Sequence, residues 1–267
     1  MLKKAVFFDA DGTIMDIQKG LAQDIPRVIE RLHANGHRAF LCTGRSRAFV
    51  PPYIEEIGLD GIIAGISTYI ELGGKCLFNR EIPQETALRS VRVLRENGLI
   101  PLLEGTEYMY YDTNEYTVQV DWFADLITAQ LAGKRRPITG NERELHFGKI
   151  SAKRRPGCSA QRACELLAQD YDFIWHGGGF AGGTIEMVPK GFSKATGISA
   201  LCRELNISLR DTVAFGDSSN DLAMLEAAGF SVAMGNASAE LAAHADYQTA
   251  PWDQGGVTQA LEHLNLI

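Results

Sequence analysis

From residue 5 to residue 64, short apolar runs alternate with a stretch in which apolar residues recur at helical spacing. The apolar positions from Ile25 to Leu32 follow the i, i+3, i+4, i+7 pattern of an amphipathic helix, which Gly36 would end, and a second helix is expected over residues 47–57. Three mostly apolar runs predict buried strands: Ala5–Phe8, Arg38–Cys42 and Gly61–Ala64. This order of elements predicts a parallel sheet with right-handed crossovers.

The pattern changes near Tyr69 and returns after Pro189. Residues 70–77 predict a hairpin around Gly73-Gly74. The middle segment predicts helices near residues 87–94 and 158–168, and strand pairs that join 100–103 to 108–111 and 173–175 to 184–188. After Pro189 the sequence predicts a helix up to Leu205, a strand over 212–215 and a helix over 221–228. One α/β core built from both ends of the chain, with a second domain inserted in it, accounts for this pattern.

Composition narrows the classes of partner. The chain has 267 residues, with 26 Lys and Arg against 33 Asp and Glu, so its net charge of −7 disfavours a nucleic-acid partner. No apolar run approaches the roughly 18–20 residues of a membrane span, and the N-terminal run reaches Asp9 too soon for a signal peptide. The five cysteines form no Cys-x-x-Cys pair, which is typical of reduced thiols in a cytoplasmic protein.

The first candidate site is Asp9-Ala10-Asp11-Gly12-Thr13, directly after the first predicted strand. Ligand sites of open α/β sheets lie beyond the carboxyl ends of the strands. Two carboxylates two residues apart can share one metal ion or divide the roles of nucleophile and acid, and Gly12 permits a tight turn that brings backbone N–H groups toward an anion. An ordinary turn rich in Asp and Gly is the alternative.

Two groups of hydrogen-bond donors follow. Thr43-Gly44-Arg45 ends the second strand and offers a hydroxyl, a backbone amide and a guanidinium to phosphate oxygens, although Thr-Gly after a strand is also a common turn. Lys194 begins a predicted helix, where the helix dipole disfavours a cation. That position indicates an anionic partner, with a solvated surface charge as the alternative.

The last candidate site is Gly216-Asp217-Ser218-Ser219-Asn220-Asp221, again after an apolar strand. Its two acids and one amide offer oxygen ligands to a hard cation. The same Ser and Asp residues could instead cap the helix that follows.

Taken together, the four motifs resemble the haloacid dehalogenase superfamily. Its phosphatases carry Asp-x-Asp-Gly-Thr, a Ser or Thr after the second strand, a Lys and Gly-Asp-x-x-x-Asp, in this order. The long insert between Thr43 and Lys194 makes the chain similar to the Cof-type sugar phosphatases. Ser67-Thr68-Tyr69 departs from the Asn-Gly-Ala that this subgroup often has. The resemblance implies a three-layer, Rossmann-like parallel-sheet core (residues 1–82 and 189–267) with an inserted α/β cap domain (residues 83–188).

The same resemblance implies a Mg²⁺-dependent phosphomonoester hydrolase that acts on a small phosphorylated metabolite, a sugar phosphate above all. Asp9 would attack phosphorus to form an aspartyl-phosphate, and Asp11 would act as general acid and base. The Mg²⁺ ligands would be the Asp9 carboxylate, the Asp11 backbone carbonyl and the Asp217 carboxylate. The phosphate would be bound by Ala10, Thr43, Gly44, Lys194 and Asn220. Supporting roles would fall to Thr13, Arg45 and Asp221.

Two other functions use the same residues. One is phosphoryl transfer to a second sugar, as in the related phosphomannomutases. The other is a catalytically silent sensor of phosphorylated ligands, which the filled catalytic positions disfavour. The glycine-rich run over residues 177–183 lacks the partner residues of a Walker loop or a dinucleotide fingerprint, so we expect a flexible cap loop there and a structural role for His176.

Overall fold

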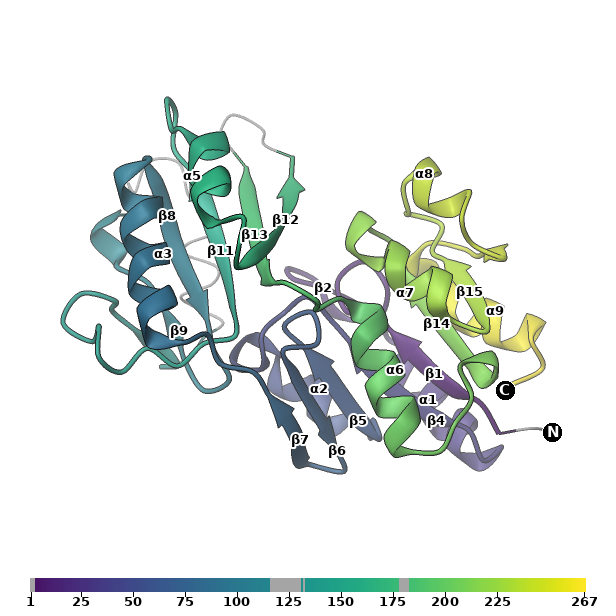
Figure 1. Ribbon diagram of the computed structural model, residues 1–267. Coiled ribbons are helices and arrows are strands. Elements are labelled where there is room, and N and C mark those ends of the chain that lie inside the picture. Colours follow the sequence, from purple (N-terminus) through teal and green to yellow (C-terminus); the bar gives the residue numbers. More distant parts are fainter. Residues whose placement is uncertain (1–2, 116–130, 132, 178–182) are drawn as a thin grey trace. The chain divides into compact units, whose positions relative to one another are not determined.

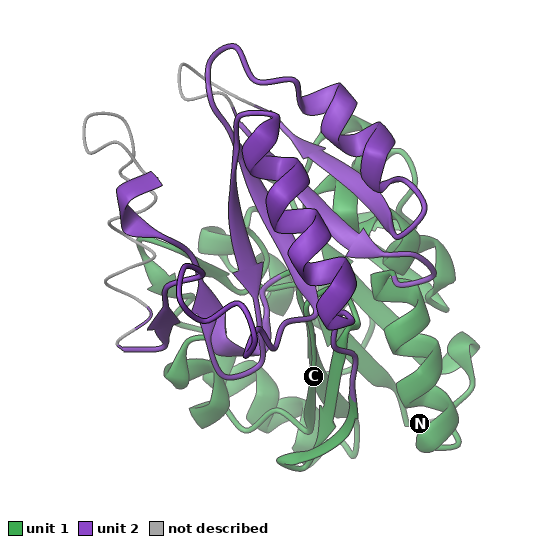
Figure 2. Ribbon diagram, turned by 60° about the vertical axis from the view of Figure 1, so that its left-hand side comes forward, with its two compact units in different colours: residues 1–44, 50–78, 193–267 green, residues 45–49, 79–192 purple. Residues whose placement is uncertain are grey.

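The computed structural model describes residues 3–115, 131, 133–177 and 183–267, so most of the glycine-rich run lies outside the described residues. The chain divides into two compact units (Figure 2): residues 1–44, 50–78 and 193–267 form the first, and residues 45–49 and 79–192 the second. The predicted boundaries between the core and cap domains, after residue 82 and after residue 188, stay predictions. In the part of the chain that the structure describes, no helix combines the length and hydropathy needed to cross a membrane.

The first unit is built on a mostly parallel sheet (Figure 1). Within the described residues it has eight strands in the order β16-β15-β14-β1-β4-β5-β6-β7. Pairing is parallel from β16 to β5 and antiparallel between β5 and β6. The strand bounds are β1 Ala5–Phe8, β4 Arg38–Cys42, β5 Gly61–Ala64, β6 Tyr69–Leu72, β7 Lys75–Asn79, β14 Thr212–Gly216, β15 Phe230–Ala233 and β16 Tyr247–Gln248. A small hairpin, β2 (Met15–Asp16) and β3 (Gly20–Leu21), follows β1.

Helices cover both faces of this sheet, because successive residues of a buried strand point to opposite sides. Val6 and Phe8 pack with one apolar cluster, and Ala5 and Phe7 with another. The first cluster includes residues of α1 (Ile25–Ala34), α2 (Pro52–Glu56) and α9 (Gly256–His263). The second includes residues of α6 (Lys194–Glu204), α7 (Leu222–Ala227) and α8 (Ala239–Ala242). The predicted three-layer α/β core is confirmed.

The expected helix over residues 47–57 is wrong. The chain instead forms a 3₁₀ turn, η1, at Arg47–Phe49 and the short helix α2. Proline disfavours helical backbone in the residue before it, so Pro51-Pro52 interrupts the helix, and Pro52 then occupies the first turn of α2, where its missing N–H is tolerated. The other 3₁₀ turns are η2 Thr113–Glu115, η3 Leu209–Asp211, η4 Ser219–Asp221 and η5 Trp252–Gln254.

The second unit contains a mainly antiparallel sheet whose described strands run in the order β10-β9-β8-β11-β13-β12. Their bounds are β8 Leu99–Glu104, β9 Met109–Tyr110, β10 Arg135–Arg136, β11 Lys149–Arg154, β12 Tyr171–His176 and β13 Thr184–Pro189. The predicted pairings of β8 with β9 and of β12 with β13 are confirmed. Helices α3 (Gln84–Glu96) and α5 (Ala160–Leu167) bury Leu94 and Leu167 in one apolar cluster with Ile150 and Met187 of the sheet.

A buried ionic network lies across four neighbouring strands of this sheet. The Lys149 Nζ is 2.9 Å from the Glu104 Oε1 and also pairs with Glu186, whose Oε2 lies 3.2 Å from the His176 Nε2. Lys149, Glu104 and Glu186 are each at most 5% exposed. Burial alone raises the pKa of Glu186, but the Lys149 charge and the His176 contact outweigh it and lower that pKa to about 2.

Because of this network, we expect part of the free energy of unfolding to be lost in acid. Because the pKa of Glu186 is about 2 in the folded protein against 4.5 ordinarily, its stabilisation is complete above pH 4.5 and is lost as the pH falls toward 2. At 1.36 kcal/mol per pKa unit, the full effect is about 3 kcal/mol. In urea unfolding, Glu186→Gln is expected to be less stable than the wild type at pH 7, and this difference is expected to narrow between pH 5 and pH 3.

The matched control is Glu165→Gln. Glu165 is 53% exposed and, among the described residues, its side chain pairs with Arg162 on the surface of α5. Surface pairs contribute little, so this variant is expected to follow the wild type at every pH. A difference for Glu186→Gln that stays constant with pH would contradict the lowered pKa of Glu186.

Candidate active site

The site lies beyond the carboxyl ends of two adjacent strands of the first unit. Asp9 follows β1 and Asp217 follows β14, and the two strands pair in parallel. The Asp9 backbone N–H extends this pairing by donating to the Phe215 carbonyl at 3.0 Å. From β1 the chain goes on to β4 and β5 on one side, and it later adds β14 and β15 on the other. The site is therefore at the topological switch point of the sheet, where open α/β folds bind their ligands.

The loop after β1 is held by its backbone. The Ala10 carbonyl accepts from the N–H groups of Thr13, Ile14 and Met15 at 3.2, 3.0 and 3.0 Å. Gly12 has a φ of +76°, and a Cβ placed there would lie 2.1 Å from the Asp217 Oδ2. Glycine therefore permits both the turn and the close approach of the two acidic loops. The Thr13 Oγ1 is buried and has no hydrogen-bond partner among the described residues, so a role of Thr13 in fixing the turn stays a prediction.

Lys194 is buried at the first turn of α6. Its Nζ donates to the Asp9 Oδ1 and to the Asp221 Oδ1, both at 2.5 Å. The helix begins there because the Ser193 hydroxyl accepts from the Thr196 N–H while the Thr196 hydroxyl accepts from the Ser193 N–H, a complete capping box. The dipole of α6 opposes a cation at this end, and the two carboxylates offset that cost. The unusual position of Lys194 is explained by these anionic partners.

Asp221 joins the lysine to the second acidic loop. Its Oδ2 accepts from the backbone N–H groups of Asp217 and Ser218, both at 3.0 Å, while its Oδ1 accepts from Lys194. Gly216 makes room for it, since a Cβ there would lie 2.5 Å from the Asp221 Cβ. Asn220 is nearby in sequence, and its Oδ1 accepts from the Ser218 hydroxyl at 2.8 Å. Both oxygens of Asp221 are thus used to hold protein groups in place.

The charges of this cluster do not balance. Burial raises the pKa of Asp9 well above its usual range, and the Asp221 charge adds to this, against the opposing effect of Lys194. Burial and the Asp221 charge likewise raise the pKa of Asp217 to about 7, with a smaller contribution from Asp11. For Lys194, burial lowers the pKa, but Asp221 and Asp9 outweigh it and the net shift is upward. Crowded carboxylates that resist ionisation indicate a missing positive charge.

A metal ion fits this arrangement. Carboxylate oxygens of Asp9, Asp217 and Asp221 lie within 4.8 Å of one another. The Asp217 Oδ1 is buried with no hydrogen-bond partner among the described residues. Because Asp221 already holds Lys194 and two backbone amides, Asp9 and Asp217 are the carboxylates with oxygens to offer. An all-oxygen set of this kind suits a hard divalent cation.

The remaining predicted residues lie in two places. Thr43 follows β4, the strand beside β1, and is buried; its N–H donates to the Ile63 carbonyl at 2.8 Å, and Gly44 comes next in the chain. Arg45 belongs instead to the second unit. Its guanidinium lies 4.5 Å from the centre of the Phe49 ring and donates to the Phe49 carbonyl at 3.3 Å. The structure thus groups Asp9, Lys194, Asp217 and Asp221 by direct contact, and the supporting role of Arg45 stays a prediction.

Sequence reasoning missed Asn236. Its Nδ2 donates to the Gly12 carbonyl at 2.9 Å and to the Asp217 Oδ2 at 3.2 Å. A sequence signal for it was available. Asn236 follows β15, which pairs in parallel with β14. Because ligand sites lie beyond the carboxyl ends of parallel strands, as for Asp9, Asn236 could have been expected at this edge of the sheet.

A doubly wound sheet with an acidic, cation-fitting centre and a buried lysine at its switch point indicates an α/β enzyme of the phosphoryl-transfer kind. Residues 6–261 match the haloacid dehalogenase-like hydrolase family. The chain is 30% identical to "Putative phosphatase YkrA" of Bacillus subtilis strain 168, over 100% of both chains. It is 27% identical to the phosphoglycolate phosphatase of Methanothermobacter thermautotrophicus, over 98% of both.

The fold agrees with a solved structure. The sugar phosphatase BT4131, of subclass IIB, superposes with a TM-score of 0.80 over 99% of this chain and all of the other, at 24% identity. The chain therefore belongs to the haloacid dehalogenase-like hydrolase family, and it is a phosphatase. The predicted family, fold class and class of enzyme are confirmed.

Proposed function

We propose that this protein is a Mg²⁺-dependent phosphomonoesterase of small phosphorylated metabolites, with sugar phosphates as the leading class, and that it works through an aspartyl-phosphate. The observation that carries the proposal is the contact of the Asp9 carboxylate with the buried Lys194 Nζ, beside a cation-fitting Asp217. A phosphoglycolate phosphatase and a sugar phosphatase among the similar proteins support small phosphorylated substrates. The free, unpaired cysteines support a cytoplasmic location.

In the first step, a carboxylate oxygen of Asp9 attacks phosphorus, and the bond from phosphorus to the ester oxygen breaks. Asp11 donates a proton to the departing alkoxide, which leaves as the alcohol. In the second step, water attacks the phosphorus of the aspartyl-phosphate while Asp11 takes up its proton. Inorganic phosphate leaves, and the Asp9 carboxylate is restored.

Charge is the obstacle to the first step. A carboxylate that approaches a phosphate dianion is repelled, by about 4 kcal/mol for each like-charge pair at 4 Å and an effective dielectric constant of 20. Lys194, fixed on Asp9 and Asp221, supplies one positive charge. Mg²⁺, held by the Asp9 and Asp217 carboxylates and by the Asp11 backbone carbonyl, would supply the charge that the cluster lacks. Phosphate oxygens would be bound by Thr43, Gly44, Asn220 and the Ala10 amide.

The test is a phosphate-release screen across phosphorylated metabolites during a Mg²⁺ titration. Release is expected for sugar phosphates and to stop in EDTA. Asp217→Asn is expected to shift the titration to higher Mg²⁺ concentration. Activity that persists in EDTA would overturn the metal requirement. Transfer of phosphate to an added sugar without release would show a phosphotransferase, and saturable binding without either reaction would show a sensor.

Lys194→Ala is expected to lower turnover of every substrate by a similar factor, roughly 10²–10³, because the lysine acts on the phosphate that all substrates share. The variant also leaves Asp9 and Asp221 buried without their cation, so its unfolding is measured alongside the kinetics. The matched control is Lys190→Ala, at an exposed lysine four positions earlier, which is expected to change nothing. If Lys194→Ala changed the order of activity among substrates and left the turnover of some unchanged, Lys194 would not act on the phosphate that all substrates share.

A further inference from the structure

Asn236 connects three loops of the first unit. Besides its two bonds to the Gly12 carbonyl and to Asp217, its Oδ1 accepts from the Trp252 backbone N–H at 3.1 Å. The Asn236 side chain is exposed, where water competes for its hydrogen bonds and each contributes little to stability. Three protein partners on one exposed amide therefore indicate a role in geometry rather than in holding the fold.

The partners allow only one orientation of the amide. The Trp252 N–H can only donate, so it must face the carbonyl oxygen of Asn236. The Gly12 carbonyl and the Asp217 carboxylate can act as acceptors, so they must face the amide nitrogen. No carboxylate could replace this side chain without setting acceptor against acceptor.

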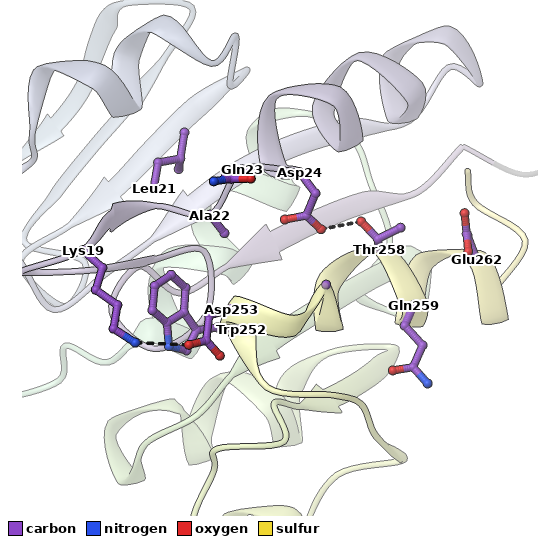
Figure 3. A pocket seen from close by; sticks show the side chains of 11 residues that line it. Lys19, Leu21, Ala22, Gln23, Asp24, Trp252, Asp253, Thr258, Gln259 and Glu262 are labelled. Carbon is purple, nitrogen blue, oxygen red and sulfur yellow. Dashed lines mark hydrogen bonds and ion pairs between the residues drawn. The ribbon is translucent and has the colours of Figure 1, made fainter.

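The Trp252 segment is itself tied to the loop that follows β2. The Lys19 Nζ pairs with the Asp253 carboxylate at 3.1 Å and lies 5.5 Å from the centre of the Trp252 ring. Figure 3 shows the Lys19 side chain pointing toward Asp253, beside Trp252. These residues line a groove of about 700 Å³, together with Gln259. The Trp252 N–H that donates to Asn236 therefore belongs to a segment with further contacts to the loop after β2.

We propose that Asn236 is a positioning residue that holds the Asp217 Oδ2, so that the Asp217 Oδ1 is presented to the divalent cation of the site. The Oδ1 is the buried oxygen with no hydrogen-bond partner among the described residues, while Asn236 occupies the other oxygen. The same amide fixes the Gly12 carbonyl, and with it the loop that carries Asp9 and Asp11. This inference rests on the cation site of the proposed function.

The experiment is a calorimetric titration of the metal-free protein with MgCl₂, without substrate, together with thermal unfolding in EDTA. Loss of a hydrogen bond to a metal-binding carboxylate typically costs 10–100-fold in metal affinity. Asn236→Ala is expected to raise the Kd for Mg²⁺ about tenfold, with the melting temperature in EDTA unchanged. The turnover number at saturating Mg²⁺ is expected to recover most of the wild-type value, because the reacting groups are intact.

The matched control is Gln259→Ala. Gln259 lines the same groove, and its side chain accepts from the Ala250 N–H at 3.1 Å, but no bond joins it to Asp217 or Gly12 among the interactions of the described residues. It is expected to leave the Kd for Mg²⁺ unchanged. A lower melting temperature of Asn236→Ala with an unchanged Kd would overturn the positioning role. A wild-type protein that binds no Mg²⁺ would overturn the proposed cation site itself.

Discussion

Asp9→Asn is expected to abolish phosphate release, with a loss of at least about 10⁴-fold in turnover at saturating Mg²⁺, since the loss of a covalent nucleophile costs this much or more in enzymes. An amide oxygen is a poor nucleophile and a weaker ligand for Mg²⁺ than a carboxylate. The Oδ1 of the new asparagine can still accept a hydrogen bond from the Lys194 Nζ, as the Asp9 Oδ1 does at 2.5 Å in the wild type. The measurement is phosphate release with the best substrate of the screen.

The fold is expected to survive this substitution. Asp9 is one of three crowded, largely buried carboxylates, so the removal of its charge relieves repulsion and leaves the melting temperature equal or higher. The stability measurement therefore separates a chemical loss from unfolding. A folded Asp9→Asn protein that retains turnover, or that still forms an acid-stable phosphoenzyme, would remove Asp9 from the nucleophile's role.

Asp11→Asn is expected to harm substrates in proportion to how much their leaving group needs a proton. A sugar alkoxide is strongly basic and needs one, whereas a nitrophenolate scarcely does. General acid catalysis is worth roughly 10²–10⁴ in rate, so the expulsion step of a sugar phosphate should fall by about that factor and that of an aryl phosphate far less. Aspartyl-phosphate is expected to accumulate with the aryl ester, because Asp11 also activates the water of the second step.

Single-turnover kinetics with both substrates make this measurement, with Mg²⁺ binding to the variant measured in parallel. The substitution does not alter the backbone of residue 11, which forms an isolated β-bridge with Met15. Equal losses for the two leaving groups, together with lost Mg²⁺ binding, would show that Asp11 holds the site together instead of donating a proton.

Much of the core was predictable because its signals are local. A run such as Ala5–Phe8 is fully buried on both faces and therefore apolar throughout, and the stripe from Ile25 to Leu32 is the buried side of α1. The exception, the helix expected over 47–57, failed at Pro51-Pro52, where the backbone constraints of proline outweigh the apolar pattern.

The candidate site was predictable only as a set of motifs. Parallel strands bring their carboxyl ends to one edge, so Asp9 and Asp217 could be expected together once both followed predicted strands. The roles of these residues stay predictions until the variants above are measured. The network of Lys149 with Glu104 and Glu186 carried no sequence signal, because an isolated Lys or Glu in a strand is nearly always exposed.

Most strands and helices of the core that flank the acidic loops, the α/β class and the positions of those loops could be predicted from the sequence, because burial periodicity and turn chemistry act between near neighbours. Tertiary structure alone decided that Lys194 meets Asp9, 185 positions away, that Asn236 holds Asp217, and that Arg45 belongs to the second unit. Those contacts depend on strand order and on the path of the connections, since residues far apart in sequence become neighbours only when the sheet places their strands side by side.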